Sequence, residues 1–278
     1  MKDLRIVFMG TPDFAVPSLE ILLDNGYEVV AAITAADKPR GRGRQLSASP
    51  VKKVALARNI PVLQPTNLKA PSFLEELKSY EANLQVVVAF RMLPEVVWSM
   101  PEYGTFNLHA SLLPQYRGAA PINWAIINGE KETGLTTFFI RHEIDTGNMI
   151  MQSREPIRET DTAGALHDRL MIKGADLVLE TVRTIEKNDY VLTAQSGDAE
   201  LKKAPKIFKE DCRIAWNARG EQVYDFIRGL SPHPGAWTIL NDKTYKIFSV
   251  RPGERHAEGS PGAYITDNKT FLSVKTKD

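Results

Sequence analysis

The first two thirds of the chain alternate short apolar runs with segments whose apolar residues recur at helical spacing. Residues 4–10, 27–34 and 84–90 are runs of the first kind, and the last of them, LQVVVAF, is the richest in β-branched residues. A helix is predicted at 49–59, where Ser49 is a candidate N-cap and a proline follows it. Strands that alternate with helices predict an α/β fold, a Rossmann-like doubly wound and mostly parallel sheet.

The same alternation continues as far as residue 187, with predicted strands at 104–110, 135–140 and 149–157. A long helix is predicted over 162–187, with Thr162 as its candidate cap. We therefore expect this part of the chain to form one domain.

The pattern changes near residues 202–216, where lysines and a proline interrupt it as a linker would. A short helical stretch, a turn-rich segment and strand-like pieces follow. We predict two domains, residues 1–204 and a smaller, β-rich, barrel-like (OB-like) domain over 205–278.

Composition excludes several classes of protein. Hydrophobic residues make up 43% and charged residues 25% of the chain, which is typical of a soluble globular protein. The net charge of +1 selects no partner, so only local patches can. The single cysteine can form neither an internal disulfide nor a Cys-x-x-Cys zinc pair, and no apolar run approaches the roughly 18–20 residues of a membrane helix. We expect a cytoplasmic protein without membrane attachment and without a metal.

The stretch NLHASLLPQYRG, residues 107–118, carries the strongest chemical signal. Alternation along the predicted strand points Asn107 and His109 to the same side, at its carboxyl end, where ligands bind in open parallel sheets. An amide and an imidazolium are two hydrogen-bond donors, which suits a carbonyl oxygen that becomes an oxyanion. Taken singly, Asn107 could cap a turn and His109 could be an interior histidine with satisfied hydrogen bonds.

A second signal is the loop DKPRGRGRQ, which carries the positive charges of Lys38, Arg40, Arg42 and Arg44 on a Pro/Gly-rich backbone. Clustered positive charge of this kind attracts phosphates regardless of sequence. A merely solvated loop is the alternative. By contrast, GTPDFA near the N-terminus lacks the Gly-x-Gly-x-x-Gly spacing of a dinucleotide site.

These motifs together resemble the folate-dependent formyltransferases. The resemblance rests on NLHASLLPQYRGAAPINWAI and extends over nearly the whole chain, through VFMGTPDFAVPSLE, KPRGRGRQLSASPVK, IDTGNMI and IRGLSPHPGAW. It implies transfer of a formyl group from 10-formyltetrahydrofolate to the amino group of initiator methionyl-tRNA, a reaction of translation initiation and one-carbon metabolism.

The resemblance also implies roles for individual residues. The family's catalytic trio falls on Asn107, His109 and Asp145, where Asp145 orients the histidine and relays a proton. A folate-binding loop is implied at Ser111, Leu112, Leu113 and Pro114. For the tRNA, the resemblance implies an apolar contact from Phe14 and insertion of the basic loop into the acceptor stem, with Arg42 as its principal arginine beside Lys38, Arg40 and Arg44.

The family's second domain commonly continues for some dozens of residues beyond the point that corresponds to Asp278. The resemblance therefore implies a truncated second domain, in a protein that we expect to be a monomer. Three alternatives stay open at this stage. The acceptor could be a small amine, such as a nucleotide or an amino sugar. The same sheet could serve a nicotinamide-dependent oxidoreductase, or the chain could be a non-catalytic RNA-binding module.

Overall fold

The structure is a computed structural model of the whole chain that describes residues 2–40, 45–143, 145–195, 200–253 and 257–278. It divides into two compact units. Unit 1 comprises Met1–Arg117, Gly134–Arg154 and Asp168–Leu201, and unit 2 comprises Gly118–Thr133, Glu155–His167 and Lys202–Asp278. The predicted domain division between residues 204 and 205, made from the change of sequence pattern near residues 202–216, stays a prediction.

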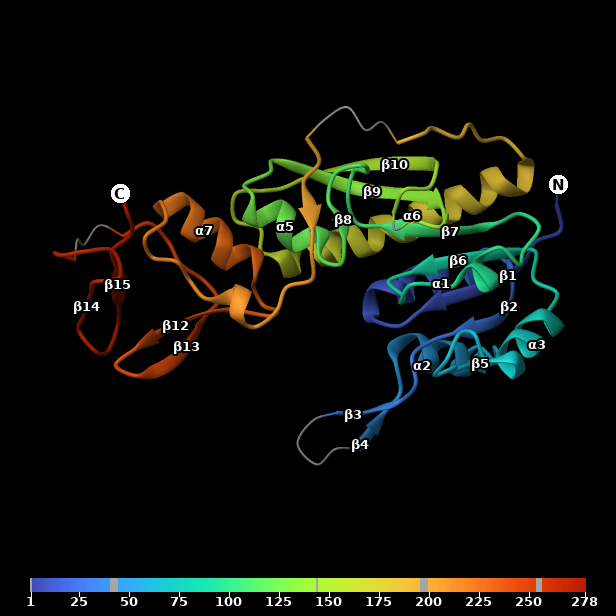
Figure 1. Cartoon of the computed structure of the whole chain (residues 1–278), viewed down its shortest axis with the longest axis horizontal. Helices are drawn as coiled ribbons and strands as arrows, with labels where there is room; N and C mark the ends of the chain where they lie inside the picture. Colours follow the sequence, from blue (N-terminus) through green and yellow to red (C-terminus); the bar gives the residue numbers. More distant parts are fainter. Residues whose placement is uncertain (1, 41–44, 144, 196–199, 254–256) are drawn as a thin grey trace. The chain divides into compact units, whose positions relative to one another are not determined.

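A seven-stranded sheet forms the centre of unit 1 (Figure 1), in the order β10-β9-β7-β6-β1-β2-β5. Neighbouring strands from β7 to β5 run parallel, whereas β9 runs antiparallel to β7. The predicted α/β fold with a mostly parallel sheet is confirmed. The strands are β1 Arg5–Gly10, β2 Glu28–Ile33, β5 Val62–Leu63, β6 Leu84–Val88, β7 Thr105–His109, β9 Glu132–Phe139 and β10 Met149–Pro156.

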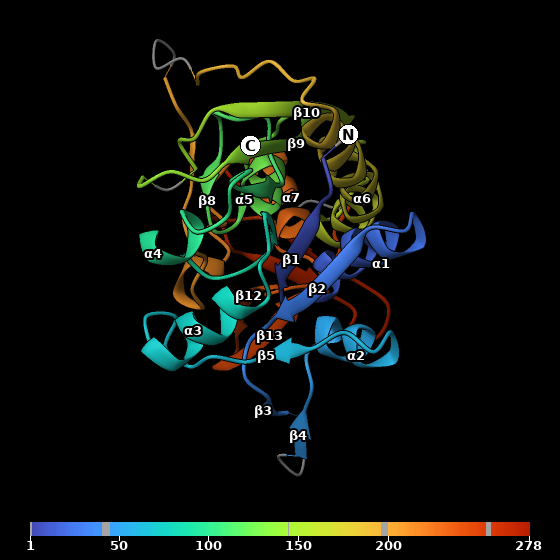
Figure 2. The same cartoon turned by 90° about the vertical axis from the view of Figure 1, so that its right-hand side faces the viewer.

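Helices cover both faces of this sheet, with α1, α2 and α6 on one face and α3 and α4 on the other (Figure 2). Two of the predicted caps are present, because the Ser49 hydroxyl accepts the backbone N–H of Lys52 and that of Thr162 accepts the N–H of Ala165, both at 3.1 Å. The helices are the 3-10 turn η1 Asp13–Ala15, α1 Val16–Asp24, α2 Pro50–Ala57, α3 Pro71–Ser79, α4 Glu95–Trp98 and α6 Ala163–Lys187.

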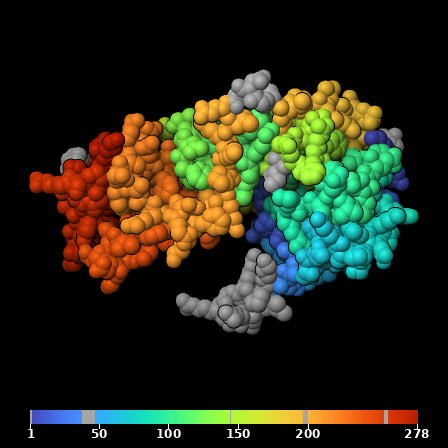
Figure 3. Space-filling view, in the orientation of Figure 1, coloured from blue at the N-terminus to red at the C-terminus, as the bar shows by residue number. Residues whose placement is uncertain are grey.

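Alternation along the central strands builds the core beneath α3 and α4. Val7, Met9 and Val87 face these helices and are at most 4% exposed. Phe73 of α3 and Val97 of α4 belong to the same buried cluster and pack these helices against the sheet. The segment from about residue 60 to 100 covers this part of unit 1 in the space-filling view (Figure 3). The packed core fixes the carboxyl ends of β1, β6 and β7, where the predicted site lies.

Two short strands that the sequence analysis did not predict flank the basic loop. Strands β3 Lys38–Arg40 and β4 Gln45–Ser47 form an antiparallel ladder in which Lys38 lies opposite Ser47. The ladder consists of three residue pairs, and Pro39 lies opposite Leu46 and Arg40 opposite Gln45. Arg42 and Arg44 lie outside the described residues.

Unit 2 contains helices packed together and two hairpins. Helix α5 Pro121–Ile127 packs on α7 Gly220–Gly229. Strands β12 Ala236–Leu240 and β13 Lys243–Ile247 form one antiparallel ladder, and β14 Tyr264–Thr266 and β15 Leu272–Val274 form another. Among the described residues these two ladders share no strand, so they form no closed barrel. Short elements complete the chain at β8 Arg117–Gly118, β11 Lys203–Ala204 and η2 Glu210–Cys212.

A buried ion pair anchors α7 within unit 2. The Arg228 guanidinium donates to the Asp225 carboxylate at 2.7 Å and to the carbonyl of Asp161 at 3.0 Å, so the charge is both paired and hydrogen-bonded.

Within the described part of the chain, no helix has the length and hydrophobicity needed to cross a lipid bilayer.

Candidate active site

The carboxyl end of β7 carries the two polar side chains that the sequence singled out. Asn107 and His109 are two residues apart on this strand, so they share a face of the sheet. His109 is buried, at 6% exposure, and Asn107 is half-buried. The Asn107 amide has no hydrogen-bond partner among the described residues. A half-buried amide with its donors unused is suited to binding a ligand oxygen.

The contacts of the His109 ring assign a role to each of its nitrogens. Nε2 lies 2.9 Å from the backbone carbonyl of Tyr116. Because a carbonyl can only accept, Nε2 carries a proton and donates it. Nδ1 faces the Asp145 carboxylate at 3.8 Å, which is ion-pair range but longer than a hydrogen bond. Nδ1 is therefore the nitrogen that can exchange a proton with a ligand or with Asp145.

A tight turn holds Asp145 in place. Asp145 has a φ of 54°, in the left-handed region that is uncommon for residues other than glycine. Two residues later, a side chain on Gly147 would put its Cβ 1.6 Å from the carbonyl oxygen of Phe139, so only glycine fits. The Thr146 hydroxyl donates to the Glu143 carbonyl at 3.0 Å.

A glutamine from a distant segment also binds this turn. The Gln195 amide donates to the carbonyls of Asp145 and Gly147, both at 2.8 Å. Its oxygen accepts two N–H groups of Arg117, from Nε at 3.0 Å and from a terminal nitrogen. Arg117 directly follows Tyr116, whose carbonyl binds His109.

The segment from Ser111 to Pro114 is held by one buried hydroxyl. Thr136 Oγ1, on β9, accepts the N–H of Leu113 at 3.1 Å and donates to the carbonyl of Ser111 at 2.7 Å. It also accepts from the Gln152 amide at 3.0 Å, so its one donor and two acceptor positions are all used. Gln152 donates further to the Leu113 carbonyl at 2.9 Å. The predicted folate loop is thus a fixed piece of backbone.

Some predicted site residues do not join this group. Phe14 lies in η1 and is 7% exposed, which is compatible with a core role. Its predicted contact with the acceptor stays a prediction. Lys38 and Arg40 lie on β3, and nothing is described of their side chains, while the other two arginines of the loop fall outside the described residues.

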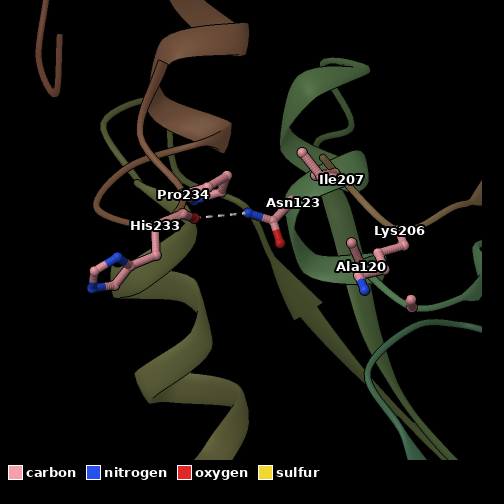
Figure 4. Close-up of a pocket in the computed structure, with 7 residues that line it drawn as sticks. Ala120, Asn123, Lys206, Ile207, His233 and Pro234 are labelled. Atoms are coloured by element: carbon pink, nitrogen blue, oxygen red, sulfur yellow. Dashed lines mark hydrogen bonds between the residues drawn. The ribbon is translucent and has the colours of Figure 1, made fainter. Parts of the chain in front are cut away.

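Unit 2 contains an open hollow of about 460 Å³ that none of the predicted catalytic residues lines. Lys206 and Asn123 border it, and Asn123 donates to the carbonyl of His233 at 3.5 Å (Figure 4). The described residues include no group of three or more metal-ligating side chains close enough to hold an ion. The predicted independence from metal stays a prediction.

Comparison with known families decides the class of this protein. The family model described as "Formyl transferase" matches residues 4–182, and that described as "Formyl transferase, C-terminal domain" matches residues 206–278. The chain belongs to the formyl transferase family. The resemblance seen in the sequence is confirmed at the level of this family.

Similar members of the formyl transferase family are named methionyl-tRNA formyltransferase. The protein of Bacteroides thetaiotaomicron is 55% identical over 285 residues, which cover 100% of this chain and 88% of the relative. That of Flavobacterium johnsoniae is 54% identical and covers 99% of this chain and 89% of the relative.

Solved structures of other proteins share the fold. A sugar 3N-formyl transferase, WlaRD, solved with dTDP and 5-N-formyl-THF, superposes with a TM-score of 0.71 at 21% identity and covers 100% of this chain and 96% of that one. HypX from Aquifex aeolicus, solved with tetrahydrofolic acid, superposes with a TM-score of 0.68 at 20% identity. The match covers 99% of this chain and 43% of HypX.

Sequence reasoning missed Thr136, Gln152 and Gln195 and gave Arg117 no role. Thr136 left a weak signal, because it is a polar residue inside a predicted apolar strand. Gln195 left none, since it lies 50 residues beyond Asp145 and outside any predicted element. Residues that support a formyl transferase site through the fold alone are invisible to local motifs.

Proposed function

We propose that this chain transfers the formyl group of 10-formyltetrahydrofolate to the α-amino group of initiator methionyl-tRNA. The observation that carries the proposal is the group of donors at the end of β7. A buried histidine faces a carboxylate at 3.8 Å, and two residues before it stands an amide with unused donors. These groups fit a formyl carbonyl, whose oxygen needs two donors and whose reaction moves one proton.

The chemistry follows from these atoms. The lone pair of the amine forms a bond to the formyl carbon, and the carbonyl π pair moves to the oxygen. Asn107 and the Nδ1–H of His109 would donate to this oxygen, and removing one such donor typically costs about 10²–10³ in rate. Return of the pair breaks the bond from carbon to the folate nitrogen. One proton leaves the amine and one reaches the departing nitrogen, and Asp145 with His109 would relay it.

The loop from Ser111 to Pro114 would bind the folate. The side chains of Leu112 and Pro114 are half-buried and offer apolar surface, whereas Leu113 is buried and would contribute only its backbone. Thr136 and Gln152 hold the backbone from Ser111 to Leu113 in one conformation. A loop that is already ordered loses little entropy when a flat, polar ring binds to it.

The β3–β4 hairpin would bind the tRNA, through phosphate contacts of Lys38, Arg40, Arg42 and Arg44. Its base is fixed by a cluster of side chains that supports this role. Lys52 donates to Asp37 at 2.6 Å and to Gln64 at 2.7 Å, and the Gln64 amide donates to Asp37 at 2.8 Å. Phe14 would contact the methionyl group. The linker lysines of unit 2, among them Lys206 beside the hollow, would make further phosphate contacts.

The choice of acceptor rests on the degree of similarity. Relatives that are 53–56% identical over almost the whole chain are named for methionyl-tRNA. The sugar N-formyltransferases among the solved structures are 16–21% identical, which supports the fold and not the acceptor. A small-amine acceptor is therefore the second candidate. We further propose that the enzyme acts in the cytoplasm, as a monomer and without a metal.

One assay tests the proposal. The full chain is incubated with methionine-charged initiator tRNA, 10-formyltetrahydrofolate and EDTA, and formyl-methionine released from the tRNA is measured. We expect Arg42→Ala to raise the KM for tRNA by roughly tenfold or more and to flatten its salt dependence, with the KM for folate unchanged. Arg58→Ala is the matched control, because this exposed arginine pairs with Asp24 away from the hairpin. Equal effects of Arg42→Ala on both substrates would favour the small-amine acceptor.

A further inference from the structure

The segment after α6 contributes a side chain to the candidate active site. Gln195 is half-buried and lies in irregular backbone, yet its amide group makes hydrogen bonds with residues 78 and 50 positions earlier in the chain. All of the groups involved belong to unit 1. No role for Gln195 or Arg117 follows from the catalytic trio itself.

The partners of Gln195 make its orientation unique. Arg117 is a donor only, so the side-chain oxygen of Gln195 must face it. The carbonyls of Asp145 and Gly147 are acceptors only, so the NH₂ group must face them. A carboxylate at position 195 would keep the contact with Arg117 but would oppose two carbonyl oxygens. The site therefore requires an amide and not merely a polar side chain.

The turn that Gln195 binds needs such a support. Asp145 is held at a φ of 54°, and Gly147 lies against the backbone of Phe139. Strained backbone persists when its surroundings fix it, and two hydrogen bonds from one amide fix the carbonyls on either side of Thr146. Gln195 thus sets the position from which the Asp145 carboxylate faces His109.

Arg117 connects the same support to the histidine. Its guanidinium holds the Gln195 oxygen, and its own peptide bond joins it to Tyr116, whose carbonyl accepts from Nε2 of His109. The path from His109 through Tyr116, Arg117 and Gln195 returns to Asp145, which faces the other nitrogen of the ring. One closed circuit therefore fixes both sides of the imidazole.

We propose that Gln195 and Arg117 are positioning residues that hold the His109–Asp145 pair in its working geometry. The inference rests on the proposed function for its kinetic readout, but the geometry that it describes can be tested without any substrate. A displacement of about 1 Å in such a pair typically costs about 10²-fold in rate.

The test compares Gln195→Met, Gln195→Glu and Arg117→Met in the full chain. We expect kcat to fall by about 10–100-fold in each, with both KM values within about threefold of wild type, because the groups that bind the substrates are untouched. Arg117→Lys keeps one donor and should lose less than Arg117→Met. The double variant Gln195→Met/Arg117→Met should be no slower than the worse single variant, since the two residues act as one unit.

Gln222→Met is the matched control. This exposed glutamine of α7 accepts the N–H of Arg219 at 3.2 Å in unit 2, and its loss should leave kcat unchanged. Thermal unfolding midpoints of all variants are measured, so that global destabilisation is separated from a local effect.

Hydrogen exchange gives the readout that needs no substrate. Deuterium uptake across residues 140–149 should be about tenfold faster in Gln195→Met than in wild type, with uptake in β6 unchanged. Unchanged uptake across this turn, or a kcat within twofold of wild type in both Met variants, would overturn the inference. If the wild-type chain fails to formylate methionyl-tRNA, the proposed function fails, and the exchange measurement still judges the role of Gln195.

Discussion

The strands of the two units differ sharply in how they are buried. All five residues of β6 in unit 1 are buried, whereas four of the five residues of β13 in unit 2 are exposed. Unit 2 also leaves large apolar side chains 37–47% exposed on its two hairpins, at Ile239, Tyr245, Tyr264, Leu272 and, just after β13, Phe248. Two-stranded ladders are marginally stable by themselves. The packed strands of unit 1 thus hold their side chains in fixed positions, whereas the hairpins of unit 2 leave apolar side chains exposed.

We propose a matching division of labour, in which unit 1 carries out the chemistry and unit 2 helps the basic hairpin of unit 1 to bind the tRNA. Proton transfer and oxyanion stabilisation need groups held to a fraction of an ångström, and the trio lies at the end of a strand within a packed sheet. Binding of a large polyanion depends on charge over a broad surface and tolerates mobility. The four predictions below test this contrast, from the largest expected effect to the smallest.

Removal of the catalytic trio should separate the two tasks most clearly. Asn107→Ala, His109→Ala and Asp145→Ala should each lower kcat by about 10²–10⁴-fold, because each removes an oxyanion donor or a proton-transfer group. The KM for methionyl-tRNA should change little. Formylation kinetics measure both values. His142→Ala is the control, since this exposed histidine precedes the Asp145 turn. Near-normal turnover in all three variants would favour a non-catalytic RNA-binding protein.

The hydroxyl of Thr136 should link stability to folate binding. Thr136→Val keeps the shape but leaves the Leu113 N–H and the Ser111 carbonyl without their partner, at about 1–3 kcal/mol for each buried group. We expect the KM for 10-formyltetrahydrofolate to rise by roughly tenfold as the loop loosens, measured beside the unfolding free energy.

Two variants control for the loss of a buried hydroxyl. Thr136→Ser retains the hydrogen bonds and should retain the folate KM. Thr137→Val removes the hydroxyl that bonds Thr181 at 2.9 Å, on the other face of β9. It should lower stability while the folate KM stays normal. A raised folate KM in Thr137→Val would contradict a specific role for the Thr136 contacts.

The sequence predicted these regions unequally, for physical reasons. Burial on both faces produces apolar runs such as 84–90, so the strands of the sheet and their neighbouring helices were predictable. Asn107 and His109 were found because they interrupt such a pattern at a strand end. The support that Gln195 gives to the site was not predicted. It depends on the path of an irregular backbone segment, 50 residues beyond Asp145, that returns to the Asp145 turn. In unit 2, half-exposed hairpins predicted β structure without predicting how its strands pair.

The single cysteine should report on the weaker unit. Cys212 is 1% exposed, and burial, aided by the charge of Asp211, raises the pKa of its thiol. Because the thiolate is the reactive form, alkylation should be slow until unit 2 opens. We expect Cys212 to be labelled in urea at concentrations where exchange in β6 is still protected, with opening of unit 2 about tenfold more frequent. Identical urea midpoints for labelling and β6 exchange would mean that the two units unfold together.

The smallest effect is expected at the base of the basic hairpin, where pH tests the cluster of Asp37, Lys52 and Gln64. The hydrogen bond from Lys52, followed by that from Gln64, lowers the pKa of Asp37 below its ordinary value of 3.8. A carboxyl whose pKa is lower in the folded state stabilises the fold above its ordinary pKa, and this contribution is lost as the pH falls through the folded value. The difference in melting temperature between wild type and Asp37→Asn should therefore be constant from neutral pH down to about pH 5 and shrink below about pH 4.

Lys52→Met tests whether this dependence belongs to the cluster. Lys52→Met removes the main cause of the lowered pKa of Asp37. The double variant Lys52→Met/Asp37→Asn should therefore show the same dependence of melting temperature on pH as Lys52→Met alone. The cluster fixes only the base of the hairpin, so Asp37→Asn should raise the KM for tRNA by a small factor, below that of Arg42→Ala, and leave kcat unchanged. A loss of kcat in Asp37→Asn would mean that the hairpin affects the chemistry as well as tRNA binding. The separation between a rigid catalytic site and a separate tRNA-binding surface would then not hold even within unit 1.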